Sequence, residues 1–272
     1  MVETDTQLIE QIQNNFISYF RLFAGLPGVT FVEENTTWMC RGPGDGPGNY
    51  ILRTQFAAAT ADQEIDRLLA RIGELAPYID WMVFPTCRPA DLGKRLEAHG
   101  ISGHRAGTWM TADLTRLPHA PAAPDGFSIQ WVQNDAELWV WKLAQDAGFG
   151  CDEQLYYDAY TRDGYGVQAA ARHYVGFQDG QPVTSGTLLM CDGIASIYNV
   201  STPPDVRRRG YASAIMSHMM GEAIGCGYRM MWIWASDAGK GVYARLGFAE
   251  EDFGIREHTW HQGGNADGAS SA

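Results

Sequence analysis

Three consecutive arginines, Arg207 to Arg209, precede Gly210 and the start of a predicted helix. The first N–H groups of a helix have no partner within it, and the helix dipole places partial positive charge there. Gly210 removes a side chain where an anion must approach the backbone, and guanidinium groups suit phosphate. The segment therefore predicts a phosphate-binding turn. The alternative is a solvated basic helix terminus, which the dipole disfavours because it repels arginine.

Other phosphate- and polyanion-binding classes fit the sequence less well. The chain contains neither G-x-x-x-x-G-K-[ST] nor G-x-G-x-x-G, the motifs of P-loops and dinucleotide folds. Its net charge is −12, with 32 acidic against 20 basic residues. Outside the arginines there is no basic face to continue a contact with nucleic acid, so we expect no nucleic-acid partner.

Two segments carry a family resemblance. The stretch from Thr202 to Ala212 resembles the acetyl-CoA loop of the GNAT N-acetyltransferase superfamily, whose Q/R-x-x-G-x-G/A pattern is met by Arg207, Gly210 and Ala212. The stretch from Ser236 to Phe248 is similar to the second cofactor motif of that family, N/S-x-x-A/G-x-x-x-Y-x-x-x-G-F. Arg208 stands where a glycine is more usual. The resemblance covers residues 127–261.

The resemblance implies the reacting groups. Tyr243 would protonate the departing CoA thiolate, since a phenol with an ordinary pKa near ~10 can act as a general acid. The amide of Val200 would stabilise the oxyanion that develops on the acetyl carbonyl. The implied acetyl-CoA-binding residues are Val200, Thr202, Arg207, Arg208, Arg209, Gly210, Tyr211, Ala212, Ser213 and Ser236. Tyr243 could instead be core, and Ser236 could simply cap the following helix.

The general base is poorly marked. Many family members place a glutamate on the strand before the loop, and Ser196 occupies that position here. Asp152, Glu153 or Asp192 could replace it, as could a water chain or an amine that arrives neutral.

The acceptor site is also thinly marked. The two helices that shape the acceptor pocket in this family contain Trp139, Trp141, Tyr156, Tyr157 and Tyr160. Helical aromatics more often belong to the core. Exposed together, these would suit a cationic or aromatic amine.

The elements that must position these residues form two related halves. We expect domains at 1–115 and 127–261, a proline-rich linker at 116–126 and a disordered tail at 262–272. The C-terminal half alternates strands and helices, with an apolar helical stripe from Tyr211 to Ile224. The fold class is thus α/β (α+β). The resemblance implies a mixed, mostly antiparallel central sheet flanked by helices.

The N-terminal half repeats the later element order, which suggests a diverged duplication; two unrelated α/β segments are the alternative. Where the arginine loop should follow its strand, the sequence is AAATADQEID, and Leu96 replaces the tyrosine. Acidic residues there would repel pyrophosphate. We therefore expect a degenerate N-terminal half and one active site. The glycine-rich stretch 42–49 fits no phosphate motif and suggests a hairpin loop.

Further classes of function are disfavoured. Five cysteines without C-x-x-C, and His258 and His261 without a third ligand, indicate no metal site. There is no secretory signal, and the longest apolar run near the end is too short to span a membrane, so we expect a cytoplasmic protein. The expected function is direct acetyl transfer from acetyl-CoA to a small-molecule or peptide amine, by a monomer or homodimer. The alternative is a sensor or assembly module that binds acetyl-CoA or another acyl-CoA without turnover.

Overall fold

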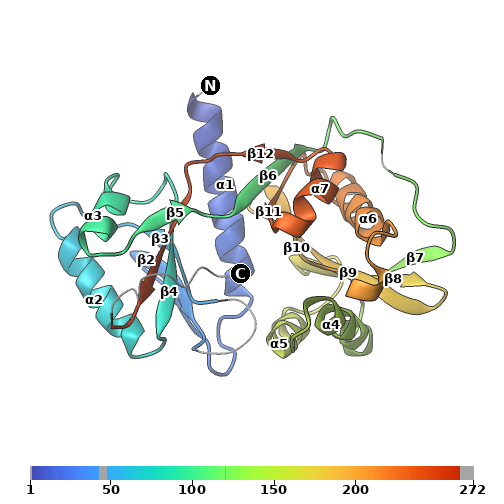
Figure 1. The fold of residues 1–272 in the computed structure, drawn as a ribbon, viewed down its shortest axis with the longest axis horizontal. Helices are drawn as coiled ribbons and strands as arrows, with labels where there is room; N and C mark the ends of the chain where they lie inside the picture. Colours follow the sequence, from blue (N-terminus) through green and yellow to red (C-terminus); the bar gives the residue numbers. More distant parts are fainter. Residues whose placement is uncertain (1, 43–47, 120, 264–272) are drawn as a thin grey trace. The chain divides into compact units, whose positions relative to one another are not determined.

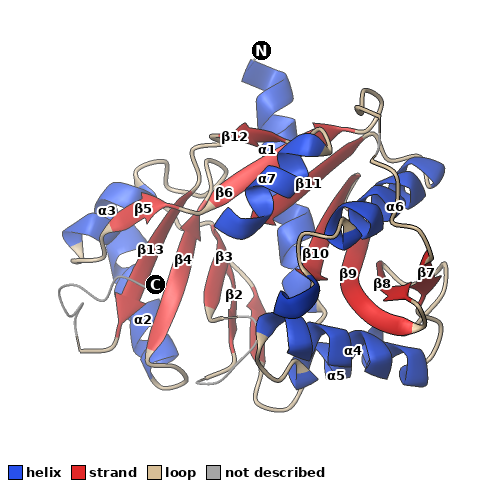
Figure 2. Cartoon of the chain, turned by 45° about the vertical axis from the view of Figure 1, so that its right-hand side comes forward, coloured by secondary structure: helices blue, strands red, loops and turns tan. Residues whose placement is uncertain are grey.

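The structure, a computed structural model, describes residues 2–42, 48–119 and 121–263. The chain divides into two compact units, which are shown in Figures 1 and 2. Unit 1 contains residues 1–106 and 252–272, and unit 2 contains residues 107–251. The predicted tail from 264 onward and the centre of the predicted hairpin loop, residues 43–47, lie outside the described residues.

In its described residues, unit 1 consists of one sheet and three helices. Its strands lie in the order β1-β2-β3-β4-β13-β5, and all neighbours pair antiparallel except β3 and β4, which are parallel. Its elements are α1 (Val2–Arg21), β1 (Thr30–Glu33), β2 (Thr36–Cys40), β3 (Tyr50–Thr54), α2 (Ala61–Gly73), β4 (Tyr78–Val83), α3 (Leu92–Ala98), β5 (Gly103–Arg105) and β13 (Arg256–His261). The repeated order that the sequence predicts begins at β3.

Unit 2 has the same plan with more elements. Its strand order is β12-β6-β11-β10-β9-β8-β7, and only β10 and β11 are parallel. Its elements are β6 (Thr108–Asp113), β7 (Phe127–Trp131), α4 (Asp135–Phe149), α5 (Gln154–Asp163), β8 (Ala171–Gln178), β9 (Gln181–Cys191), β10 (Ile194–Ser201), the 3-10 turn η1 (Pro204–Val206), α6 (Tyr211–Gly225), β11 (Met230–Ala235), α7 (Asp237–Arg245) and β12 (Ala249–Glu251). The pairs α4/α5 and α6/α7 lie on opposite sides of β9 and β10 (Figure 2). The expected mixed, mostly antiparallel sheet flanked by helices is confirmed.

The units differ from the expected domains in their closing strands. The predicted boundaries place Thr108–Asp113 in the first half and Arg256–His261 in the second. The structure pairs β6 with β11 and β12 of unit 2, and β13 with β4 and β5 of unit 1. The two halves thus exchange equivalent strands. The sequence of a strand shows that the segment is extended but does not specify which of two sheets it joins.

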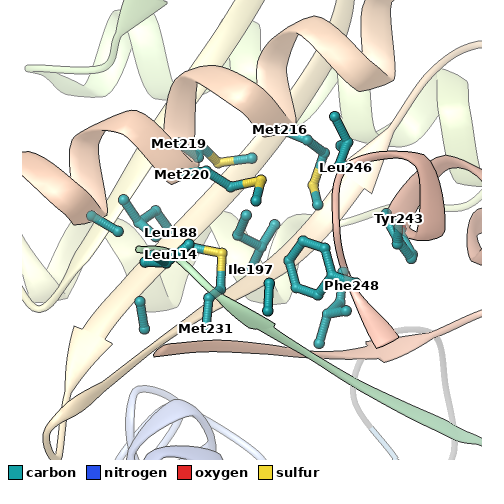
Figure 3. Packing of buried hydrophobic residues seen from close by; sticks show 14 of the residues in the cluster. Leu114, Leu188, Ile197, Met216, Met219, Met220, Met231, Tyr243, Leu246 and Phe248 are labelled. Atoms are coloured by element: carbon teal, nitrogen blue, oxygen red, sulfur yellow. The ribbon is translucent and has the colours of Figure 1, made fainter. Parts of the chain in front are cut away.

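The core of unit 2 on the α6 side is rich in methionine. Met216, Met219 and Met220 of α6 pack against strand residues such as Ile197 and Met231 (Figure 3). The predicted apolar stripe is therefore the buried face of α6 except at its end, where Ile224 is 45% exposed. Unbranched methionines fill irregular space, which suits a helix that crosses strands of unequal spacing.

Candidate active site

The site lies where β10 and β11 part. Their parallel pairing covers only Ala195 and Ser196 of β10. On its other side β10 has a bulge, because Asn199 and Val200 together face Gly186 of β9. Asn199 adopts a left-handed backbone with φ of 54°. The strands therefore stop pairing before β10 ends.

The arginine turn leads from β10 into α6. Gly210 is the N-cap residue of α6, with φ of 91°, a conformation that favours glycine. No side chain caps this helix end. The N–H groups of Tyr211, Ala212 and Ser213 thus form an uncapped helix N-terminus, which attracts anions.

The three arginines do different things. The Nε and Nη2 of Arg207 donate to the carbonyls of Thr202 and Gly148, each at 2.9 Å. Arg209 donates to the Asp205 carbonyl at 3.3 Å, and Arg208 is exposed with φ of 63°. The left-handed backbone of Arg208 explains why glycine is more usual there. Two of the guanidinium nitrogens of Arg207 thus bond backbone carbonyls, so this side chain shapes the turn.

The turn is tied to α4. The Ser201 hydroxyl donates to the Ala144 carbonyl at 3.1 Å, and the Thr184 hydroxyl donates to the Ser201 carbonyl at 2.7 Å. A Cβ on Gly148 would lie 1.7 Å from Ser201 Oγ. Gly148 therefore allows α4 to approach the end of β10. Thr202 follows, and its hydroxyl lies 3.1 Å from that of Thr184.

Tyr243 lies on α7, which begins directly after β11. It is 8% exposed, and burial raises the pKa of its phenol. Its hydroxyl has no hydrogen bond within the described residues, and its oxygen remains accessible to solvent. A Cβ on Gly239 would lie 2.7 Å from that oxygen, so Gly239 provides the space for it. Ser236 caps α7, since its hydroxyl accepts from the Gly239 amide at 3.3 Å.

Contacts disfavour Asp152 and Glu153 as the general base, and its position disfavours Asp192. Asp152 accepts from Lys142 at 2.6 Å, which lowers the pKa of its carboxyl. Glu153 is 5% exposed, and its Oε1 accepts from the Cys151 thiol at 3.0 Å. Asp192 precedes β10, about 25 Å along the strand from Val200 at the usual rise.

The five aromatics split between core and surface. Trp141 and Tyr160 are fully buried, with ring centroids 5.3 Å apart. Trp139 is 44% exposed and packs edge-on against Tyr157. Tyr156, partly buried, lies 6.1 Å from Tyr160 by ring centroid. They therefore form no single exposed cage.

The hydrogen bonds that hold Asn199 have no recognisable signal in the sequence. Gln145 is fully buried and donates to the Asn199 carbonyl, and Tyr160 donates to the Asn199 side chain. The resemblance implies for Asn199 only that its backbone groups are free for the pantetheine arm. A left-handed asparagine is tolerated because its short polar side chain can bond locally, yet nothing in a strand pattern indicates it.

Within the described residues, no group of three His, Cys, Asp or Glu side chains could hold a metal ion. A search of the same part of the chain for helices long and apolar enough to cross a membrane finds none.

Comparison with known proteins identifies the fold. Residues 135–248 match the sequence model of the Acetyltransferase (GNAT) family. A GCN5-related N-acetyltransferase from Kribbella flavida is 14% identical over 92% of this chain and 95% of its own, with a TM-score of 0.67. A tandem GNAT protein from the clavulanic acid biosynthesis pathway is 16% identical over 97% and 96%, with a TM-score of 0.63. No curated protein matches the chain.

Residues 135–248 therefore resemble a GNAT acetyltransferase domain, and the whole chain shares the fold of these tandem GNAT structures. The fold class and the family resemblance expected from the sequence are confirmed.

Proposed function

We propose that the protein transfers acetyl from acetyl-CoA directly to an amine of a small molecule or peptide, using a single site in unit 2. The observation that carries this proposal is the gap between β10 and β11 beside the uncapped start of α6. An open strand edge can bond the amides of a pantetheine arm, and a free helix N-terminus binds pyrophosphate. The family of the domain fits this assignment.

The residues of the acetyl-CoA site divide between backbone and side-chain roles. The amides from Arg207 to Ser213 would hold the pyrophosphate, with Arg208 and Arg209 adding charge at the exposed rim. The backbone of Val200 and Thr202 would bond the pantetheine arm. Ser236 would contact it only at the cost of sharing its capping hydroxyl.

Acetyl transfer requires the amine nitrogen to attack the acetyl carbonyl carbon. The Val200 amide would donate to the carbonyl oxygen as negative charge develops there. When the tetrahedral intermediate collapses, the C–S bond breaks and Tyr243 would give its proton to the leaving sulfur. Because burial raises the pKa of Tyr243, the phenol remains protonated at neutral pH and able to donate. The amine enters neutral or loses its proton to water.

All five cysteines lie among the described residues and none forms a disulfide, which is compatible with the reducing cytoplasm that we propose for this protein.

The test is to measure acetyl-CoA binding by calorimetry and then thiol release against a panel of amines. Tyr243→Phe should lower kcat by about 100-fold or more while the Kd for acetyl-CoA stays within about 2-fold. Tyr228→Phe, two residues before β11 begins, is the matched control and should retain activity. Absence of acetyl-CoA binding would contradict the proposal. Binding without turnover on any amine would favour a sensor.

A further inference from the structure

Gln145 is a buried amide with two donors in use. Its side chain is 0% exposed, and its Nε2 donates to the Asn199 carbonyl at 2.5 Å and to Ser185 Oγ at 2.7 Å. Ser185 lies opposite Ser201 in the β9–β10 register. Gln145 thus joins α4 to both strands on either side of the bulge.

The bond to the Asn199 carbonyl has a directional consequence. A peptide unit is planar and trans, so the N–H of Val200 points opposite to the carbonyl of Asn199. Since Gln145 holds that carbonyl from the α4 side, the Val200 N–H faces away from α4. The Val200 side chain packs against the cluster around α6, on the other side of the sheet.

Tyr160 fixes the same residue through its side chain. Its hydroxyl donates to Asn199 Oδ1 at 2.9 Å, and its ring is fully buried. Asn199 is therefore held at both its carbonyl and its side chain while its backbone stays left-handed. A left-handed non-glycine residue persists only where its surroundings enforce it.

Gln145 is not explained by stability alone. Its Oε1 is buried and has no hydrogen-bond partner among the described residues. A buried acceptor left without a partner destabilises a fold. The Oε1 atom of Gln145 therefore destabilises the fold, and the contribution of this side chain lies in the two hydrogen bonds that its Nε2 donates.

Unit 1 contains a counterpart of Gln145, which makes a similar contact away from the proposed acetyl-CoA site. Gln13 of α1 donates through Nε2 to the Leu52 carbonyl at 2.9 Å, and Leu52 is the extra residue of a bulge in β3. There the Gln13 Oε1 accepts from the Thr86 hydroxyl at 2.6 Å. The same glutamine–bulge contact exists in both units, but only in unit 2 does the bulge lie beside an open strand edge.

We infer that Gln145, assisted by Tyr160, is a positioning residue: it turns the peptide between Asn199 and Val200 so that the Val200 N–H meets the acetyl carbonyl of bound acetyl-CoA. This inference rests on the proposed function, because it requires acetyl-CoA in the gap between β10 and β11.

The experiment compares wild type, Gln145→Met and the matched control Gln13→Met. Calorimetry measures Kd for acetyl-CoA and for CoA, and isotope-edited infrared spectroscopy measures the carbonyl stretch of acetyl-CoA labelled with ¹³C at that carbon. Gln145→Met should reduce the preference for acetyl-CoA over CoA by about 3- to 10-fold, the equivalent of one hydrogen bond. The carbonyl stretch should move to higher frequency, and Kd for CoA should hardly change. Gln13→Met should alter thermal stability and neither ligand readout.

Each outcome decides between the two proposals. If wild type binds neither ligand, the proposed function is wrong. If wild type binds acetyl-CoA but Gln145→Met keeps its preference and its carbonyl frequency, the inference on Gln145 is overturned and the function stands. Tyr160→Phe removes one hydroxyl and decides the matter if Gln145→Met does not fold: a smaller change of the same sign supports the inference, and no change contradicts it.

Discussion

Each unit has one pair of parallel strands, and the units differ in whether the chain itself fills the gap beside that pair. In unit 2, α7 starts two residues after β11 ends. In unit 1, residues 84–91 separate β4 from α3, and part of this loop enters the gap. The Arg88 amide donates to the Thr54 carbonyl at 2.8 Å, and the Phe56 amide donates to the Arg88 carbonyl at 3.1 Å. The chain itself thus occupies in unit 1 the strand edge that we propose acetyl-CoA uses in unit 2.

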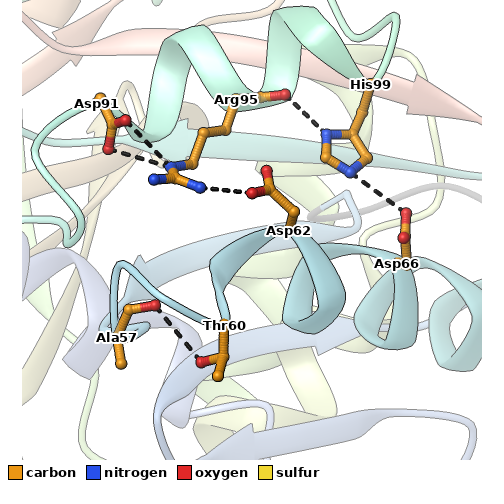
Figure 4. Close-up of polar contacts among 7 residues, drawn as sticks. All are labelled: Ala57, Thr60, Asp62, Asp66, Asp91, Arg95 and His99. Carbon is orange, nitrogen blue, oxygen red and sulfur yellow. Dashed lines mark hydrogen bonds and ion pairs between the residues drawn. The ribbon is translucent and has the colours of Figure 1, made fainter.

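The helices α2 and α3 of unit 1 are bonded to each other through their side chains. Arg95 of α3 bonds Asp62 of α2 at 2.5 Å and Asp91 at 3.1 Å, and His99 lies 3.3 Å from Asp66 (Figure 4). Asp62 also stands in the first turn of α2, where the equivalent turn of α6 has no acidic residue. In unit 1 these side chains are therefore bonded to one another rather than left available to a ligand.

The largest expected effect comes from giving α6 the acidic first turn of α2. Ala212→Asp should weaken acetyl-CoA binding by about 100-fold or more, since like charges a few ångströms apart repel by several kcal/mol at a protein surface. Thermal stability should not fall, because a carboxylate at a helix N-terminus is favourable.

Calorimetry and thermal melts check that prediction. Wild type should bind one acetyl-CoA per chain. Asp62→Ala in unit 1 is the control and should leave the stoichiometry at one, because the loop still fills the gap. A second molecule bound to wild type would refute the contrast between the units.

Because of Glu257 on β13, one of the two exchanged strands, we expect the stability of unit 1 to depend on pH. Burial, with the neighbouring Asp80 carboxylate, raises the pKa of Glu257 on β13 to about 7. The folded state therefore holds this proton more tightly than the unfolded state, and stability should fall as pH rises from about 4.5 to about 7. Glu257→Gln should raise the free energy of unfolding by about 1–2 kcal/mol at pH 8 and leave it nearly unchanged at pH 4.

Chemical denaturation at both pH values measures that difference. Glu251→Gln, exposed on β12 of unit 2, is the matched control and should change stability at neither pH. An equal gain for Glu257→Gln at pH 4 and pH 8 would show that ionisation is not the cause.

The smallest effect concerns the turn that only unit 2 has. Arg208→Gly should raise stability by up to about 1 kcal/mol, because glycine adopts a left-handed backbone without strain. Its affinity for CoA should fall only a few-fold, since one exposed charge is lost. Arg209→Gly, at a residue without positive φ, should instead destabilise the protein. Thermal melts with and without CoA would measure both changes in stability. Equal changes in melting temperature for the two variants would contradict the assignment of strain to Arg208.

Much of unit 2 was predictable because its signals are local. The stripe of α6, the glycine before it and the cap at Ser236 depend on residues within one or two turns of each other. The degenerate state of unit 1 was predictable in part, from the acidic residues and Leu96. The loop that fills its gap was not, because the pairing of Arg88 with Thr54 depends on strands that meet only after folding.

By itself the sequence determined the fold class, and it located the arginine turn before α6 that we propose binds acetyl-CoA. These depend on spacing, charge and backbone freedom along short segments. Tertiary structure alone decided which sheet each closing strand joins, that Arg207 bonds carbonyls of its own chain, and that Gln145 meets Asn199 across 54 residues. Such contacts are set by packing among distant segments, and the periodicity of a single segment cannot encode its partner.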